Sequence, residues 1–479
     1  MQTRRVLTKV DFMKYGISRR ELMGSALAAG AVAVLPGAHR MAGAAPLPRT
    51  LTAGPAAAPL VGGKWPDTKV WAYDGVVPGP EIRVRQGDTV RVVARNGLEQ
   101  PTTVHWHGIR LPNAMDGVPD LTQQAIPPGG EFSYEFEAMD AGSFWYHPHV
   151  NSMEQQDRGL AGALIVEERE PVRVDRDVTW VIDDWVLREN AQIDDSFGHQ
   201  MQMSHGGRTG NTVTLNGRVP TEFAVKSGER IRLRLINVAN ARTFGLKFGK
   251  LEPKIIALDG QPVAPHEPAN GRVVVAAAQR VDLIIDMSGK PGEKVQVTDD
   301  YFRRREYEFV TIAHDEGKPL RESPLDSPIA LPRNPLPEPV PDDQAQRELI
   351  VLSGGAMGRM PPGVDSFIQQ GQYWFLNDLP AKGRDGEPIF SVPRGRTCVI
   401  GMVNETGWEH PMHLHGFAFR VLSRNGKPNM RGEWLDTVLV GRGETVEVAF
   451  VADNPGDWMF HCHILEHMAA GMSCFLRVA

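Results

Sequence analysis

The chain has 479 residues, of which 41% are hydrophobic and 7% aromatic, and it contains 49 Gly and 37 Pro. This length exceeds what one hydrophobic core normally supports, so two or three domains are expected, and the Gly and Pro content favours short strands and turns over long helices. The formal net charge of −6 argues against nucleic-acid binding.

Residues 1–44 differ in composition from the rest of the chain. Arg19 and Arg20 precede an uncharged apolar run at 22–38, and small residues follow at 42–44. This pattern is typical of a twin-arginine export signal that is cleaved at its end. The alternative is a membrane anchor, but the run is short for a bilayer span of about 20 residues. We therefore expect recognition by the twin-arginine export machinery and a soluble, periplasmic or otherwise exported mature protein without stable membrane insertion.

Short runs of alternating apolar and charged residues follow from residue 69 onward, for example at 81–85, 89–94, 230–236 and 444–450. Alternation with a period of two predicts strands that place one face in a core and the other in water. An all-β protein made of sandwiches or Greek-key barrels is therefore expected.

A turn-then-strand phrase occurs three times, starting at residues 85, 226 and 393, and each copy is followed by an asparagine, namely Asn96, Asn237 or Asn404. The spacings are domain-sized and predict three copies of one fold, in which each phrase opens the same strand. The predicted domains are 45–170, 171–315 and 346–479, with an extended linker at 316–345 where Pro, Asp and Glu are dense.

Histidines are concentrated in two clusters near opposite ends of the mature chain. Four His-x-His pairs occur, and they are His105 with His107, His147 with His149, His413 with His415, and His461 with His463. Residues at i and i+2 of a strand point the same way, so each pair can offer two imidazoles to one metal centre. A single pair of this kind is more often accidental than functional, but four pairs predict a metal site.

A cysteine indicates which metal is bound. Cys462, His467 and Met472, with the upstream His410, supply a thiolate, two imidazoles and a thioether. This set matches the ligands of a blue-copper electron-transfer site. A structural zinc site is the alternative, but it needs only four ligands and no thioether.

At these motifs the chain resembles the multicopper oxidase family, in particular its three-domain bacterial laccase-like and copper-efflux-oxidase branch. The resemblance implies three cupredoxin-like Greek-key barrels and four copper ions, with type 1 copper in the third domain and a trinuclear cluster between the first and third. It implies type 1 ligation by His410, Cys462, His467 and Met472. It implies type 2 ligation by His105 and His413, and type 3 ligation by His107, His147, His149, His415, His461 and His463.

Electron and proton transfer are the next expectations. Cys462 lies directly between His461 and His463, so an electron leaving the thiolate can reach the cluster through covalent bonds. Reduction of dioxygen to water also needs protons, and Asp116 and Glu466 fall where related oxidases have acidic residues thought to deliver them. The alternative is that each is an ordinary solvated or hydrogen-bonding carboxylate.

The reducing substrate is left open between phenols or aromatic amines and metal ions, with a dedicated cuprous oxidase as the main alternative. Met201 and Met203, and in another loop Met357 and Met360, have soft thioethers suited to Cu(I). Because four methionines in two loops are sparse, a flexible surface loop is the favoured interpretation. A non-catalytic copper-binding or envelope scaffold is the alternative of another class, disfavoured because no ligand position is missing.

Other side chains also have two interpretations. Glu409 and Asp436 are expected near the rim of type 1 copper, where a carboxylate could attract a cation or accept a phenol proton, or could be structural. Cys398 and Cys474 could pair or could both be small buried residues in strands, and the second interpretation is favoured.

Overall fold

The structure is a computed structural model that describes residues 48–302, 304–321, 323, 325, 329–381 and 386–479. The predicted export signal at 1–44 lies outside the described residues, and the predicted linker at 316–345 is described in part. The chain divides into two compact units, Met1–Pro46 and Leu47–Ala479, and the account below concerns the second. None of its described helices is both long and apolar enough to cross a membrane.

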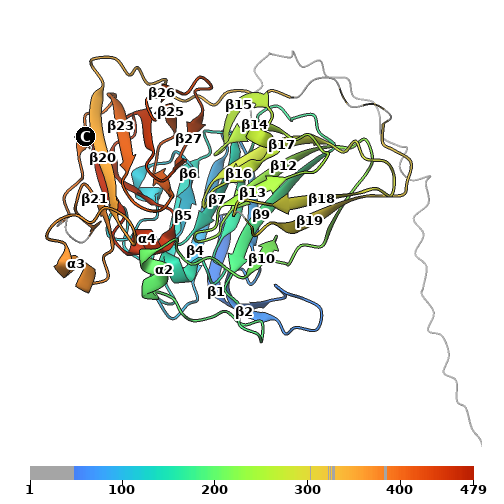
Figure 1. Ribbon diagram of the computed structural model, residues 1–479, viewed down its shortest axis with the longest axis horizontal. Helices are drawn as coiled ribbons and strands as arrows, with labels where there is room; N and C mark the ends of the chain where they lie inside the picture. The colour runs from blue at the N-terminus through green and yellow to red at the C-terminus, as the bar shows by residue number, and fades with distance from the viewer. Residues whose placement is uncertain (1–47, 303, 322, 324, 326–328, 382–385) are drawn as a thin grey trace, which may run out of the picture. The chain divides into compact units, whose positions relative to one another are not determined.

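The first pair of sheets uses residues 49–167 (Figure 1). One sheet has the order β2-β1-β4-β6, with β1 at Arg49–Ala58, β2 at Thr68–Tyr73, β4 at Thr89–Asn96 and β6 at Glu131–Glu137. The other has the order β3-β8-β7-β5, with β3 at Gly79–Arg85, β5 at His105–His107, β7 at Gly142–His147 and β8 at Gly162–Glu167. Burial alternates strictly along β4, as its period-two sequence predicts.

The second pair of sheets has the orders β10-β9-β12-β17-β14-β15 and β11-β19-β18-β13-β16. The strands of the first sheet are β9 Arg176–Trp185, β10 Thr212–Leu215, β12 Arg230–Asn237, β14 Lys254–Leu258, β15 Gln261–His266 and β17 Arg280–Asp286. Those of the second sheet are β11 Glu222–Val225, β13 Phe244–Lys247, β16 Val273–Val275, β18 Lys294–Asp299 and β19 Tyr307–His314.

The third pair of sheets has the orders β21-β20-β23-β29-β25-β26, with β27 beside β25, and β22-β31-β30-β24-β28. The strands of the first sheet are β20 Gln346–Gly354, β21 Trp374–Leu376, β23 Thr397–Asn404, β25 Phe419–Arg424, β26 Lys427–Pro428, β27 Trp434–Leu435 and β29 Thr445–Val451. Those of the second are β22 Ser391–Val392, β24 His410–Leu414, β28 Thr437–Val440, β30 Gly456–Cys462 and β31 Ser473–Val478.

The helices are short and lie in connections between strands. They are α1 Ser152–Gln155, α2 Gln200–Ser204, α3 Asp365–Gln369 and α4 Leu465–Ala469, with 3-10 turns η1 at Asn113–Met115 and η2 at Ala269–Gly271. Of these, α2 and α4 lie side by side (Figure 1), so they bring residues of the second and third pairs of sheets together.

The threefold repeat is confirmed by strand pairing. The repeated phrases open β4, β12 and β23, and each of these strands pairs parallel with the first strand of its own sheet pair. The asparagines that end the three strands also act alike. The side chains of Asn96, Asn237 and Asn404 each accept a hydrogen bond from the backbone N–H two residues further on.

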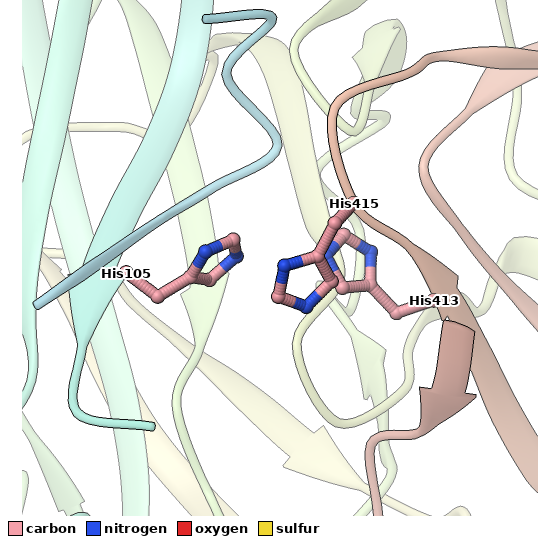
Figure 2. A group of neighbouring side chains, drawn as sticks. All are labelled: His105, His413 and His415. Carbon is pink, nitrogen blue, oxygen red and sulfur yellow. The ribbon is translucent and has the colours of Figure 1, made fainter. Parts of the chain in front are cut away.

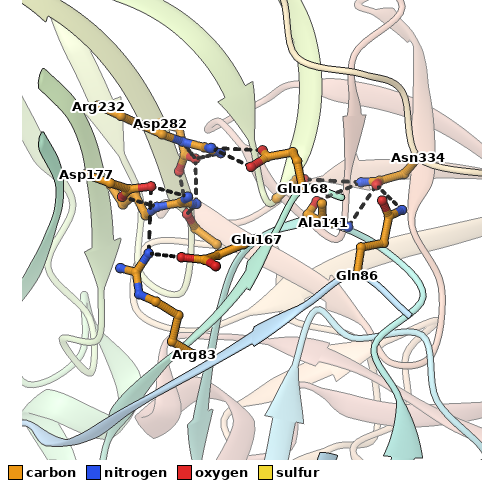
Figure 3. A network of polar contacts seen from close by, with 12 residues as sticks. Arg83, Gln86, Ala141, Glu167, Glu168, Asp177, Arg232, Asp282 and Asn334 are labelled. Carbon is orange, nitrogen blue, oxygen red and sulfur yellow. Dashed lines mark hydrogen bonds and ion pairs between the residues drawn. The ribbon is translucent and has the colours of Figure 1, made fainter. Parts of the chain in front are cut away.

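One expectation about solvent exposure is wrong at β12. Its arginines were expected to face water, but Arg232 is fully buried between the first and second pairs of sheets. Its guanidinium lies 2.8 Å from Glu168 and 2.7 Å from Asp282, in the polar network of Figure 3. Alternation places the charges on one face correctly, but a second domain covers that face, which a single strand's pattern cannot reveal.

Candidate metal centre

Strand register brings the His-x-His pairs together. His105 in β5 lies opposite His147 in β7, and His413 in β24 lies opposite His461 in β30. All four side chains are buried. The first and third domains therefore each contribute a two-stranded histidine ladder, and these two ladders meet.

The first triplet of rings spans both domains. The His107 ring centroid lies 5.0 Å from that of His463 and 5.7 Å from that of His147, and the latter two are 5.2 Å apart. Two of these imidazoles come from the first domain and one from the third.

The second triplet mirrors the first. His149 lies 4.9 Å from His415 and 5.2 Å from His461, and the latter two are 5.2 Å apart between ring centroids. His105 and His413, with centroids 5.9 Å apart, complete the eight-membered histidine cluster. Figure 2 shows these two rings converging with that of His415, with one nitrogen of each within 4.8 Å of the others.

The inner nitrogens of the histidine cluster fit a metal. Several buried ring nitrogens have no hydrogen-bond partner among the described residues, and they are His105 Nε2, His107 Nδ1, His147 Nε2, His149 Nε2, His413 Nε2 and both nitrogens of His463. Burial lowers the pKa of His107, His147 and His149 well below the usual histidine value, so each is a neutral imidazole with a lone pair to donate. Buried polar atoms without partners are rare in proteins, and metal coordination accounts for this group.

Asp116 orients two of these rings from the first domain. It directly follows η1, where its backbone N–H donates to the Asn113 carbonyl at 3.1 Å. Its carbonyl oxygen lies 2.7 Å from His105 Nδ1, and its carboxylate Oδ2 lies 2.9 Å from His415 Nδ1. With Nδ1 held in this way, Nε2 of His105 faces the cluster centre.

Asp436 has a corresponding position in the third domain, and the expectation that it lies at the rim of type 1 copper is wrong. Its carbonyl oxygen lies 2.8 Å from His413 Nδ1, and its Oδ1 lies 3.2 Å from His107 Nε2. The second contact holds Nε2 of His107, which leaves its Nδ1 without a partner among the described residues and directed inward. Pairing of β28 with β24 causes this placement, because it sets Thr437 opposite His413; residue spacing gave no sign of it.

A second site, the thiolate group, consists of His410, Cys462 and His467. The Cys462 sulfur lies 3.5 Å from His410 Nδ1 and 3.7 Å from His467 Nδ1, and the two nitrogens are 3.1 Å apart. The outer nitrogens are held by Thr406 Oγ1 at 2.7 Å from His410 Nε2 and by the His205 carbonyl at 2.5 Å from His467 Nε2. Both Nδ1 atoms are thereby directed at one point beside the sulfur.

Met472 and the burial of Cys462 complete the thiolate group. Met472 is fully buried, its N–H donates to the His467 carbonyl at 2.9 Å, and its carbonyl accepts from Cys462 N–H at 3.1 Å. Burial raises the pKa of the Cys462 thiol, so a bound cation is required for it to serve as a thiolate. Of the other cysteines, Cys398 is a free buried thiol in β23, and Cys474 is buried in β31. The interpretation that favoured small buried residues is thus confirmed.

Glu466 lies in α4 between the thiolate group and the second domain. Its carboxylate accepts from Arg208 N–H at 3.0 Å and from the Asn240 amide at 3.2 Å, and no hydrogen bond among the described residues joins it to the histidine cluster. Burial raises its pKa.

The two methionine-bearing loops meet beside the thiolate group. Ala356 N–H donates to the Ser204 carbonyl at 2.7 Å, which joins the second loop to the end of α2. Met201 is 57% exposed and Met357 76% exposed, so their thioethers face solvent. The sequence separation between these loops gave no indication of this proximity.

A cavity of about 580 Å³ lies on another side of the thiolate group. Its lining includes Trp408, Glu409 and Pro411, which flank ligand candidate His410, and Tyr301 of the second domain. The Tyr301 hydroxyl donates to the Glu409 carboxylate. Glu409 is therefore placed near the thiolate group, as expected.

Three family models described as multicopper oxidase match residues 60–171, 176–317 and 360–479. The multicopper oxidase MmcO of Mycobacterium tuberculosis is 31% identical, over 96% of this chain and 97% of that protein.

Solved structures give the same result. A multicopper oxidase from Pseudomonas thermotolerans is 33% identical with a TM-score of 0.80, covering 90% of this chain and 99% of that one. A multicopper oxidase from Campylobacter jejuni, described as a metallo-oxidase, is 26% identical with a TM-score of 0.74, covering 90% of each chain. The chain therefore belongs to the multicopper oxidase family: it has three cupredoxin-like domains and is a copper-dependent oxidoreductase that uses dioxygen.

Proposed function

We propose that the protein is a laccase-like oxidase that holds four copper ions. Type 1 copper is assigned to the thiolate group with Met472, and type 2 copper to His105 and His413. The two type 3 coppers are assigned to the two ring triplets, one to His107, His147 and His463 and the other to His149, His415 and His461. The convergence of buried ring nitrogens, several of which have no hydrogen-bond partner among the described residues, is the observation that supports this assignment.

When bound, type 1 copper supplies one-electron oxidation of a substrate, and the trinuclear cluster supplies the four-electron reduction of dioxygen to water. The chain provides the link between them, because Cys462 is bonded through the backbone to His461 of one triplet and His463 of the other. Asp116 and Glu466 are proposed to deliver protons. Asp116 is supported by its contact with His415, and Glu466 by a raised pKa that favours the protonated form.

The cavity beside His410 supports a phenol or aromatic amine as the reducing substrate. Its volume of about 580 Å³ is within the range of small-molecule sites, and Trp408 offers an aromatic face. Glu409 is positioned to accept the proton that a phenol loses on oxidation, with Tyr301 fixing its carboxylate.

The meeting of the two methionine loops favours Cu(I) as a second candidate substrate. Exposed thioethers of Met201 and Met357 offer soft ligands close to His205, whose carbonyl holds His467. The relative described as a metallo-oxidase is consistent with such a substrate.

Oxygen uptake by the copper-loaded protein, with a substituted phenol and with anaerobically prepared Cu(I), separates the two candidates. The variant Met201→Leu/Met357→Leu removes the thioethers but leaves the His205 carbonyl in place, so type 1 copper is undisturbed. We expect it to lower Cu(I) oxidation several-fold and leave phenol oxidation unchanged. Equal Cu(I) rates would remove the loops from the mechanism, and absence of uptake with both substrates in a blue, copper-replete protein would contradict the oxidase assignment.

For the cellular location, the proposal is export through the twin-arginine machinery to the periplasm or an equivalent compartment. It depends on the sequence at 1–44 alone.

A further inference from the structure

A buried ion network extends from the second domain to the histidine cluster. Arg280, the first residue of β17, is fully buried, and Asp259 and Asp436 are almost completely buried beside it. The Arg280 Nη1 atom donates to Asp436 Oδ1 at 2.9 Å, and Nη2 donates to Oδ2 at 2.5 Å. Both carboxylate oxygens of Asp436 are therefore held by one guanidinium, in the fork geometry that only arginine provides.

Asp259 holds the backbone of the segment that contains Asp436 and Thr437. Its Oδ2 accepts from the backbone N–H of Thr437 at 3.0 Å, and its Oδ1 accepts from Arg280 N–H at 3.0 Å. Gln279 adds a third bond, from its amide to the Thr437 carbonyl at 2.8 Å. The turn between β27 and β28 is thus anchored to the second domain on several sides.

Of the two carboxylates in this network, Asp436 is the one that touches the histidine cluster. Its Oδ1 lies 3.2 Å from His107 Nε2, and its carbonyl oxygen lies 2.8 Å from His413 Nδ1. Asp259 instead accepts hydrogen bonds from the backbone N–H groups of Thr437 and Arg280.

A cavity of about 390 Å³ opens between the second and third domains above this network, and Asp259, Gln279 and Arg280 lie in its lining. Arg280 is fully buried although it lines the cavity, and Asp436, to which its guanidinium bonds, is not among the lining residues. Removal of the guanidinium would open a path for water to a carboxylate that now orients two cluster histidines.

We propose that Arg280 is a positioning residue for the type 2 side of the trinuclear cluster. Through Arg280, the second domain controls how firmly copper is held, although none of the assigned copper ligands comes from that domain. The proposal rests on the proposed ligand assignment. Arg280 fixes Asp436, Asp436 directs the His107 ring so that Nδ1 faces inward and holds His413 Nδ1, and both rings then present their partnerless nitrogens.

The test compares Arg280→Lys with Arg232→Lys. Both arginines are fully buried, lie in strands of the same sheet and pair with two carboxylates. The carboxylates of Arg232 are Glu168 and Asp282, and among the described residues neither of them bonds a cluster histidine, whereas Asp436 beside Arg280 does. The fully loaded proteins are exposed to a copper chelator, and copper content, type 2 electron paramagnetic resonance and type 1 blue absorption are followed over time.

For Arg280→Lys we expect loss of one copper per chain about 10–100-fold faster than in the unaltered protein, with an altered type 2 signal and an unchanged blue band, since changes to residues that support ligands have effects of this size. Arg232→Lys should lower thermal stability without either change. Equal chelation rates and type 2 signals in all three proteins would overturn the proposal. If the unaltered protein does not load four coppers, the ligand assignment itself fails, which is a different outcome from failure of the Arg280 role.

Should Arg280→Lys fold too poorly to load copper, Arg280→Met/Asp436→Asn removes both charges together and keeps the volume similar. Weakened retention of type 2 copper in this variant supports the role of the Arg280–Asp436 pair, which the proposal requires, and normal retention contradicts it.

Discussion

Asp116 touches the histidine cluster through its backbone carbonyl and through both carboxylate oxygens. The carbonyl lies 2.7 Å from His105 Nδ1 whatever the side chain is, and Oδ1 lies 3.3 Å from the same nitrogen, whereas the contact with His415 depends on the carboxylate. An amide in its place would keep the size and one acceptor but lose the charge and the ability to carry a proton.

We expect Asp116→Asn and Glu466→Gln each to lower the rate of oxygen reduction by about 10²-fold while leaving the type 1 blue absorption unchanged, because general acids contribute at least that factor. Stopped-flow reoxidation of the reduced protein measures the step directly. Asp120→Asn is the matched control, since Asp120 is exposed and lies in the same loop. A variant that reoxidises at the normal rate would exclude that residue as a proton donor.

At this scale the sequence identified the histidines that the structure brings together, because His-x-His spacing on strands and the Cys-His-Met order are local patterns. It did not predict Arg280, Asp259 or the role of Asp436. Their partners are distant in the chain and are brought together by domain docking, for which no local pattern exists.

At the scale of elements, the end of β5 shows how closely the ion network packs against the cluster. Gly108 follows His107 and adopts a φ of +85°, and a Cβ at this position would lie 2.3 Å from Arg280 Nη2 and 2.6 Å from Asp436 Oδ2. A side chain here is therefore opposed both by backbone conformation and by the buried ion pair.

Gly108→Ala should destabilise the protein by about 1–3 kcal/mol from backbone strain, with a further loss from displacement of the ion pair. Urea unfolding of the chelated protein provides the measurement. Gly129→Ala has a similar φ of +73° but open space around the new methyl group, so it reports strain alone. Equal losses of unfolding free energy in the two variants would show that displacement of the Arg280 side chain does not destabilise the protein.

The strands themselves followed from the sequence, since period-two alternation in β4 and the thrice-repeated turn identified equivalent elements correctly. The burial of the charged face of β12 did not follow from the sequence. Alternation indicates which residues share a face of a strand, but it does not indicate what covers that face. Arg232 lies on a face that water would reach only if the first domain were absent.

At the scale of the whole molecule, the proposed copper ligands come from the first and third domains, so metal binding would link these domains. Anything bound only by the folded state stabilises that state in proportion to the logarithm of its concentration over its dissociation constant. The partnerless buried nitrogens also leave the metal-free centre at an energetic disadvantage.

Removal of copper by a chelator should therefore lower the thermal unfolding temperature by on the order of 5 °C. Differential scanning calorimetry before and after chelation tests this, and restoration of the original Tm by added copper excludes damage to the protein. Identical unfolding temperatures with and without copper would contradict preferential binding of copper by the folded state.

The separation of β5 and β7 from β24 and β30 also bears on biosynthesis. His107 and His463 share one triplet but are 356 positions apart, so their meeting closes a very long loop. A chain emerging N-terminus first completes its first-domain histidines long before their partners are made. A nascent or truncated polypeptide that lacks the third domain therefore contains only the first-domain histidines of the centre. Maturation thus has a fixed order, in which completion of the last domain precedes assembly of the oxygen-reducing site.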